Sequence, residues 1–124
     1  MNTPLVPIPR VPVTVRPAAM NDLPFIDALQ KRHTRMVGWM PTKQLVQKIT
    51  LGHVLVAEDD AKQPAGYCIG HDQYFKRDDV GIIYQMNVVP GRQRSFVGAT
   101  LLKAMFDRAA YGCRLFCCWC AQDI

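Results

Sequence analysis

The sequence lacks the features of a membrane or secreted protein. None of its apolar runs approaches the about 20 residues that a membrane-spanning helix needs. The N-terminus, Met1-Asn2-Thr3-Pro4, has neither the charged nor the apolar region of a signal peptide. These two absences argue against a membrane anchor and a secretory leader, and they predict a cytoplasmic protein.

The five cysteines lack the arrangement of a metal site. Four of the five crowd together at Cys113, Cys117, Cys118 and Cys120, with no second pair of ligands elsewhere. Near neighbours on one strand bridge each other poorly, because their side chains alternate between its faces or lie along one face. The pattern therefore predicts reduced thiols and no metal.

The bulk properties fit one compact domain. The chain has 124 residues, of which 49% are hydrophobic, and its formal net charge is +5. Residues 1–10 carry three prolines and no period, which predicts an extended arm before a single domain over residues 11–124. A basic balance suits ligands that carry phosphate, although a solvated basic surface is the plain alternative.

Periodicity predicts the element order β-α-α-β-β-β-α-β. A helix between the last two strands makes a crossover, so these strands should be parallel, while the earlier strands should pair antiparallel. The expected fold is α/β (α+β): a mixed, mostly antiparallel sheet flanked by helices. The strands are expected at 11–16, 53–58, 65–70, 80–89 and 115–120, and the helices at 22–35, 42–52 and 98–110.

A basic, turn-forming loop separates the fourth strand from the last helix. It runs from Val88-Val89-Pro90-Gly91 to Gly98-Ala99 and contains Arg92 and Arg94. Backbone N–H groups and the helix dipole favour an anion at such a helix start. The stretch predicts a phosphate site, and our first hypothesis is that it holds the diphosphate of a cofactor.

With its element order, this stretch resembles the GNAT N-acetyltransferase superfamily. The matching motif is Met86-Asn87-Val88-Val89-Pro90 followed by Gln93-Arg94-Ser95-Phe96-Val97-Gly98, and the likeness covers about residues 13–120. The resemblance implies an acyl-CoA N-acyltransferase-like fold. It also implies an enzyme that moves an acetyl group from acetyl-CoA, its cosubstrate, to an amine-bearing small molecule or protein.

The resemblance also implies where the cofactor would bind. In the family, a bulge parts the fourth strand from the fifth, and the pantetheine arm bonds to the freed backbone groups. Here these groups belong to Met86 and Val88. The diphosphate would lie on the N–H groups at the start of the helix, at Arg94, Ser95, Phe96, Val97, Gly98 and Ala99.

The chain departs from the family pattern at two positions of this region. Phe96 replaces a usual glycine, which is tolerable if φ stays negative and the ring points away from the ligand. Ile82 stands where members often carry a glutamate base. Tyr84 faces the same side of the strand and becomes the candidate proton-handling residue, with a packed tyrosine as the alternative. Gln85 and Asn87 are expected on the opposite face.

The chain stops just after its fifth strand, where the family continues with a helix and a hairpin. The expectation is a truncated form, or a homodimer in which a second copy covers the exposed fifth strand. His33, His53 and His71 have no acid or nucleophile nearby in sequence, so each is assigned a structural or exposed role.

Two other functions stay open. One is a catalytically inert module of the same fold that binds acyl-CoA or a protein partner. The other is a small nucleic-acid binder, but its basic residues lie on amphipathic helices where a charged face is usual, and no nucleic-acid motif is present. Nucleic acid is therefore not expected as a partner. These basic residues are Lys31, Arg32, Arg35, Lys43 and Lys48.

Overall fold

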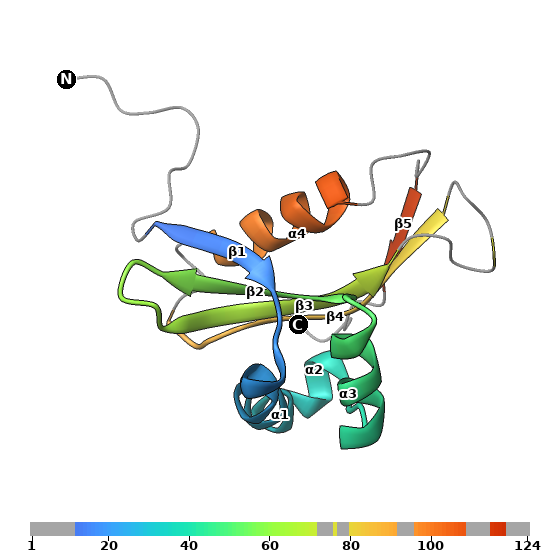
Figure 1. The fold of residues 1–124 in the computed structure, drawn as a ribbon, viewed down its shortest axis with the longest axis horizontal. Helices are drawn as coiled ribbons and strands as arrows, with labels where there is room; N and C mark the ends of the chain where they lie inside the picture. Colours follow the sequence, from blue (N-terminus) through green and yellow to red (C-terminus); the bar gives the residue numbers. More distant parts are fainter. Residues whose placement is uncertain (1–11, 72–75, 77–79, 92–95, 109–114, 119–124) are drawn as a thin grey trace.

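A computed structural model describes residues 12–71, 76, 80–91, 96–108 and 115–118 (Figure 1). Within them, the sheet has the order β1-β2-β3-β4-β5. Its strands are β1 Val13–Pro17, β2 Val54–Asp59, β3 Pro64–His71, β4 Val80–Val88 and β5 Leu115–Cys118. The 3₁₀ helix η1 is Met20–Asp22, and the α-helices are α1 Leu23–Arg32, α2 Thr34–Val37, α3 Thr42–Thr50 and α4 Val97–Arg108.

The pairing of the strands confirms the expected fold class. Strands β1 to β4 pair antiparallel, and β4 pairs parallel with β5. Helix α4 is the crossover between the two parallel strands. Pro12 has no N–H for a ladder, and accordingly β1 begins at Val13 and lies at the edge of the sheet.

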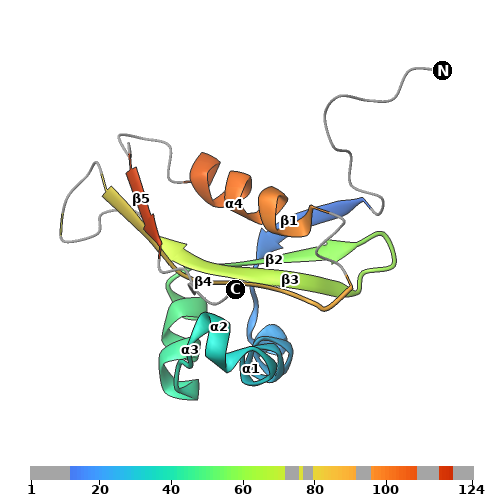
Figure 2. The same ribbon diagram turned by 180° about the vertical axis from the view of Figure 1, so that it is seen from behind.

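Helices cover both faces of the sheet. Helix α4 lies on one face and α1, α2 and α3 lie on the other, as the two opposite views show (Figures 1 and 2). Each face has its own apolar cluster. Tyr67 and Ile69 of β3 pack toward α1 and α3, whereas Cys68 between them packs toward α4. This alternation is what a sheet buried on both sides requires.

The single helix expected over residues 22–35 is wrong. The chain leaves the α conformation at His33, where φ is −119° and ψ is 27°. The N–H of His33 is shared between the carbonyls of Leu29 and Gln30, and a short helix follows. The side chain of His33 is hydrogen-bonded to Asn87 of β4, a contact between distant segments that periodicity cannot reveal.

Strand β4 contains a bulge at Tyr84. Ile69 pairs with Gln85 and Gly70 pairs with Ile83, so Tyr84 is one extra residue. Tyr84 packs on the cluster under α1 and α3, and Gln85 bonds to Tyr67 of that same cluster. The expectation that Gln85 and Asn87 face away from Tyr84 is wrong, because the bulge interrupts the alternation.

Some predictions lie outside the described residues. They concern the arm at residues 1–10, Arg92, Arg94, Ser95, Cys113 and Cys120. For β5 the backbone is described, but the burial of its side chains is not. Among the described helices, none is long and apolar enough to cross a membrane.

Candidate functional site

The backbone of β4 changes its surroundings at the bulge. Up to Ile83 it is paired with β5, and within the described residues that pairing goes no further. An ideal Cβ on Gly66 of β3 would stand 2.7 Å from the Asn87 carbonyl oxygen, so the polar backbone groups of Asn87 face β3. Those of the flanking residues, Met86 and Val88, therefore face away from β3.

The start of α4 lies directly over this part of β4. An ideal Cβ on Gly98 would stand 3.5 Å from Met86 Sδ and 3.7 Å from Val88 Cγ2. Val97 is fully buried and anchors the helix start, while Ala99 is exposed. Four residues singled out from the sequence, Met86, Val88, Val97 and Gly98, are thus brought together between the strand and the helix N-terminus.

Phe96 immediately precedes α4 in a left-handed conformation. Its φ is +58° and its side chain is 39% exposed. Its carbonyl oxygen accepts a hydrogen bond from Thr100 N at 3.1 Å, which closes the first turn of the helix. The condition that φ stays negative is therefore not met: Phe96 adopts a backbone conformation that only glycine adopts without strain.

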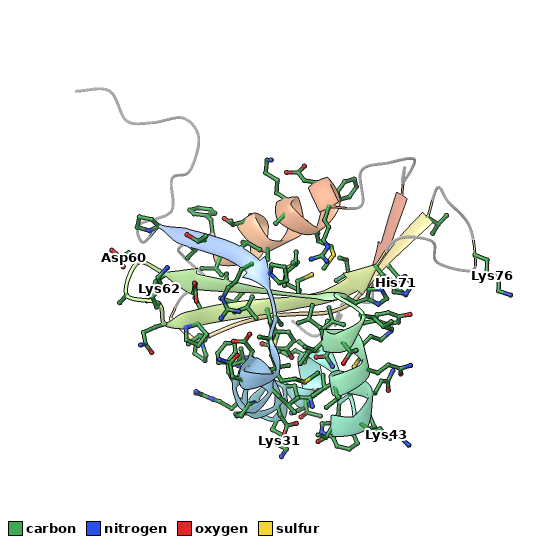
Figure 3. All side chains as sticks on the ribbon, in the orientation of Figure 1. Lys31, Lys43, Asp60, Lys62, His71 and Lys76 are labelled. Carbon is green, nitrogen blue, oxygen red and sulfur yellow. The ribbon has the colours of Figure 1, made fainter. Side chains whose placement is uncertain are left out.

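Tyr84 lies between a lysine and a histidine. Its hydroxyl is 3.3 Å from Nε2 of His71, and Lys48 Nζ lies 4.4 Å from the centre of its ring. His71 stacks on His53 with 4.7 Å between the ring centres, and Figure 3 shows His71 where β3 ends. Burial lowers the pKa of Lys48. The tyrosine is half-buried, so the structure gives it both packing and polar partners.

A buried amide network connects β4 to α1. Tyr67 donates a hydrogen bond to Gln85 Oε1 at 2.7 Å, and Asn87 Nδ2 donates to the Tyr67 hydroxyl at 3.3 Å. Gln85 Nε2 donates to Gln30 Oε1, also at 3.3 Å. Burial raises the pKa of Tyr67 to about 12, so this hydroxyl is a neutral donor. The network fixes β4 beside Met86 and Val88.

His33 joins this network from the break between α1 and α2. Its Nδ1 lies 2.6 Å from Asn87 Oδ1. Sequence reasoning assigned His33 a structural or exposed role, and it used Asn87 only as part of the motif and as a residue on the face opposite Tyr84. The available signal was the pair Gln85 and Asn87, two polar residues at alternate positions in an otherwise apolar strand.

A basic cavity of about 340 Å³ opens beside His33. It is lined by Lys31, Arg32, His33, Thr34, Arg35 and Met36. Lys31 Nζ also pairs with Asp27 at 3.0 Å. The loop after α2 leaves Trp39 57% exposed, whereas Met40 is buried and both its backbone polar groups bond to Gln30.

A smaller cavity of about 120 Å³ lies at the other end of the sheet. Its lining includes His53, His71 and Arg108. Across the part of the chain that is described, no three His, Cys, Asp or Glu side chains gather as a metal site would require.

The chain resembles known proteins in its sequence profile and in its fold. The acetyltransferase (GNAT) family profile matches residues 23–123. No curated protein sequence matches the chain significantly.

Three solved structures illustrate the similarity of the fold. N-acetylglutamate synthase from Neisseria gonorrhoeae, complexed with coenzyme A and N-acetyl-glutamate, is 25% identical with a TM-score of 0.70, over 79% of this chain and 22% of its own. Rv2747 from Mycobacterium tuberculosis, in complex with CoA, is 19% identical with a TM-score of 0.75, over 88% of this chain and 65% of its own. The aminoglycoside 6'-N-acetyltransferase AAC(6')-Ih from Acinetobacter baumannii is 20% identical with a TM-score of 0.70, over 90% of this chain and 82% of its own.

The chain thus spans 22% of the length of the gonococcal protein and 65% of the length of the mycobacterial one.

Proposed function

The chain belongs to the acetyltransferase (GNAT) family, and from that premise we propose that it transfers an acetyl group from acetyl-CoA to an amine. One observation carries the proposal. The N-terminus of α4 lies over β4 where the backbone groups of Met86 and Val88 face away from β3, beyond the pairing described for β5. Two of the similar structures are complexes with CoA, which supports the same cosubstrate here.

In this proposal the cofactor runs along β4 toward the helix. Its pantetheine arm bonds to the backbone of Met86 and Val88. Its diphosphate lies on the N–H groups of residues 94–99, because a helix start combines unpaired donors with a favourable dipole. The close contact of Gly98 with Met86 and Val88 supports a continuous path from strand to helix.

The chemistry needs positioning more than a covalent intermediate. The amine nitrogen attacks the thioester carbonyl carbon, the carbon–sulfur bond then breaks, and CoA leaves as a thiolate that takes up a proton. The amine loses one proton during the attack. We propose that Tyr84, at the bulge and beside His71 and Lys48, helps to position water or a proton for these steps.

The acceptor in this proposal is a small molecule or protein that carries an amine and a negative charge. Arg32 and Arg35 are exposed in the cavity beside His33, and Lys31 lines it as well. Cations converging on one cavity favour an anionic group, and arginine suits a carboxylate best. The gonococcal structure contains N-acetyl-glutamate, which supports an acidic acceptor.

A thiol-release assay tests the activity. Acetyl-CoA is offered with glutamate, 2,4-diaminobutyrate and an aminoglycoside, and calorimetry measures acetyl-CoA binding separately. We expect thiol release with glutamate, a KM that rises with salt, and a higher KM in Arg35→Gln than in the control Lys43→Gln on α3. Absence of both binding and thiol release would refute the proposal.

A second candidate function is a catalytically inert module that binds acyl-CoA or a protein. The observation that favours it is Ile82, a fully apolar residue that is 1% exposed where family members often carry a glutamate base. This module would bind acetyl-CoA in calorimetry and release no thiol with any amine.

The remaining expectations also stay proposals: one domain over residues 11–124, a cytoplasmic location and a homodimer that covers β5. Strand β5 lies at the end of the described sheet, which supports a second copy there. Light scattering at several protein concentrations tests the dimer.

A further inference from the structure

The break between α1 and α2 holds the imidazole of His33 against β4. Its Nδ1 lies 2.6 Å from Oδ1 of Asn87, a residue far away in the sequence. Asn87 is 3% exposed, and its amide lies in the buried network of β4. The helix break and the network therefore define the orientation of one histidine ring.

The hydrogen bonds of Asn87 determine which nitrogen of that ring carries the proton. Asn87 Nδ2 donates to the carbonyl oxygen of Leu29 at 3.2 Å, and a carbonyl oxygen can only accept. The amide oxygen must then face His33. An oxygen acceptor requires a donor opposite, so Nδ1 carries a hydrogen, and in the neutral ring Nε2 is left with its lone pair.

Nε2 belongs to a side chain that is accessible. His33 is half-buried and lines the basic cavity of about 340 Å³. No described residue forms a hydrogen bond with Nε2. The charged residues that line this cavity together with the ring are Lys31, Arg32 and Arg35, and from the sheet the neutral amide of Asn87 meets the ring.

The site proposed for acetyl transfer needs a base, and β4 carries neither a carboxylate nor an imidazole. Its Tyr84 is proposed only to help position water or a proton. Ile82 is apolar, and Asn87 lies between Met86 and Val88, whose backbone groups are proposed to hold the pantetheine arm. We propose that His33 is the general base for the acceptor amine, acting through Nε2, and that Asn87 is the residue that positions it. This inference rests on the proposed acetyl transfer.

The proton balance of the step is simple. As the amine nitrogen bonds to the thioester carbon, Nε2 of His33 takes the proton that the nitrogen loses. The imidazolium keeps its Nδ1–H bond to Asn87 Oδ1. When the carbon–sulfur bond breaks, the CoA thiolate takes one proton, and the imidazolium gives its proton to the thiolate or to solvent water.

Two substitutions, His33→Asn and Asn87→Asp, distinguish a general base from a residue that only stabilises the fold. In His33→Asn the new amide nitrogen stands near the position of Nδ1 and can still donate to Asn87, but no base remains. We expect kcat to fall about 100-fold or more, within the range of general acid–base catalysis, with acetyl-CoA affinity and Tm little changed. Added imidazole should restore part of the rate.

The dependence of kcat on pH distinguishes the two roles, because a purely structural role of His33 would leave the profile unchanged. The acid limb of log kcat should disappear in His33→Asn. In Asn87→Asp the limb should move to higher pH, because a carboxylate beside the ring favours the imidazolium. An unchanged kcat and profile in His33→Asn, with an active wild type, would overturn the inference while leaving acetyl transfer intact.

The tautomer can be measured without turnover. A long-range ¹H–¹⁵N spectrum of the full chain should show the hydrogen of neutral His33 on Nδ1, and a hydrogen on Nε2 would overturn the inference. A wild type that binds no acetyl-CoA and releases no thiol would refute the proposed function itself, and the base role with it.

Discussion

The carbonyl oxygen of Phe96 accepts hydrogen bonds from both the backbone nitrogen and the hydroxyl of Thr100, at 3.1 and 3.0 Å. The backbone φ of Phe96 itself is +58°. A residue with a Cβ thus occupies the left-handed position that opens α4. That conformation costs an ordinary residue about 1–2 kcal/mol.

Phe96→Gly should therefore leave the protein at least as stable and should tighten acetyl-CoA binding. Relief of strain is offset in part by the greater freedom of glycine in the unfolded chain. We expect the free energy of unfolding to rise by about 0–1.5 kcal/mol, measured by urea denaturation. Phe96→Ala is the control, because it removes the ring and keeps the strain. Equal effects of the two variants would assign the change to the ring instead.

Tyr67→Phe should destabilise the amide network of β4. The Tyr67 hydroxyl, fully buried, donates to Gln85 Oε1 and accepts from Asn87 Nδ2. Its removal leaves two buried polar groups with fewer partners, which costs about 1–3 kcal/mol. Chemical denaturation measures the loss. Tyr84→Phe, at a half-buried hydroxyl, is the comparison and should cost less; the reverse order would contradict the role given to the network.

Asp22 should make the protein sensitive to acid. Its two hydrogen bonds from Arg16, at 2.8 and 2.9 Å, hold the pKa of its carboxyl below the ordinary 3.8, and the N–H of Ala19 adds to the effect. A lowered folded pKa means that this stability is present above pH 3.8 and is lost as the pH falls through the folded pKa.

Asp22→Asn should accordingly lower the free energy of unfolding by about 1.5 kcal/mol at neutral pH. This value is at the low end for a hydrogen bond to a charged group, because Arg16 is partly exposed. Urea denaturation should show this difference shrinking as the pH falls below 3.8. Asp60→Asn removes an exposed carboxylate and serves as the control. A difference that stays constant with pH would contradict the assignment.

Gly66→Ala should disturb β4 more than Gly98→Ala, although both glycines face the same strand. A Cβ at Gly66 would stand 2.7 Å from the Asn87 carbonyl oxygen, whereas one at Gly98 would make ordinary contacts at 3.5 Å or more. We expect Gly66→Ala to cost about 1–3 kcal/mol and Gly98→Ala close to nothing. Thermal unfolding of the two variants under the same conditions measures this difference in stability.

The sequence predicts the architecture well because strand and helix periods are local signals. The two-residue alternation around Val15 and the apolar run that ends at Val88 define their strands without knowledge of the fold. The parallel pairing of β4 with β5 follows from one intervening helix. The position of α4 after the loop also follows, since Pro90 and Gly91 end the strand.

The details of the site depend on contacts between distant segments, which a local pattern does not contain. The bulge at Tyr84 shifts the alternation by one residue, so Gln85 and Asn87 turn toward α1. The periodicity of the surrounding residues predicts one continuous helix. The helix instead breaks at His33, whose ring is hydrogen-bonded to Asn87. Phe96 takes a backbone conformation that its own side chain disfavours.

The most direct test of the account is an NMR titration of the ¹⁵N-labelled chain with desulfo-CoA, which cannot transfer an acetyl group. We predict that the largest amide shifts occur at Met86, Val88 and residues 97–99, where β4 meets the start of α4. No shifts at millimolar ligand, or shifts confined to other parts of the chain, would contradict the proposed cofactor site.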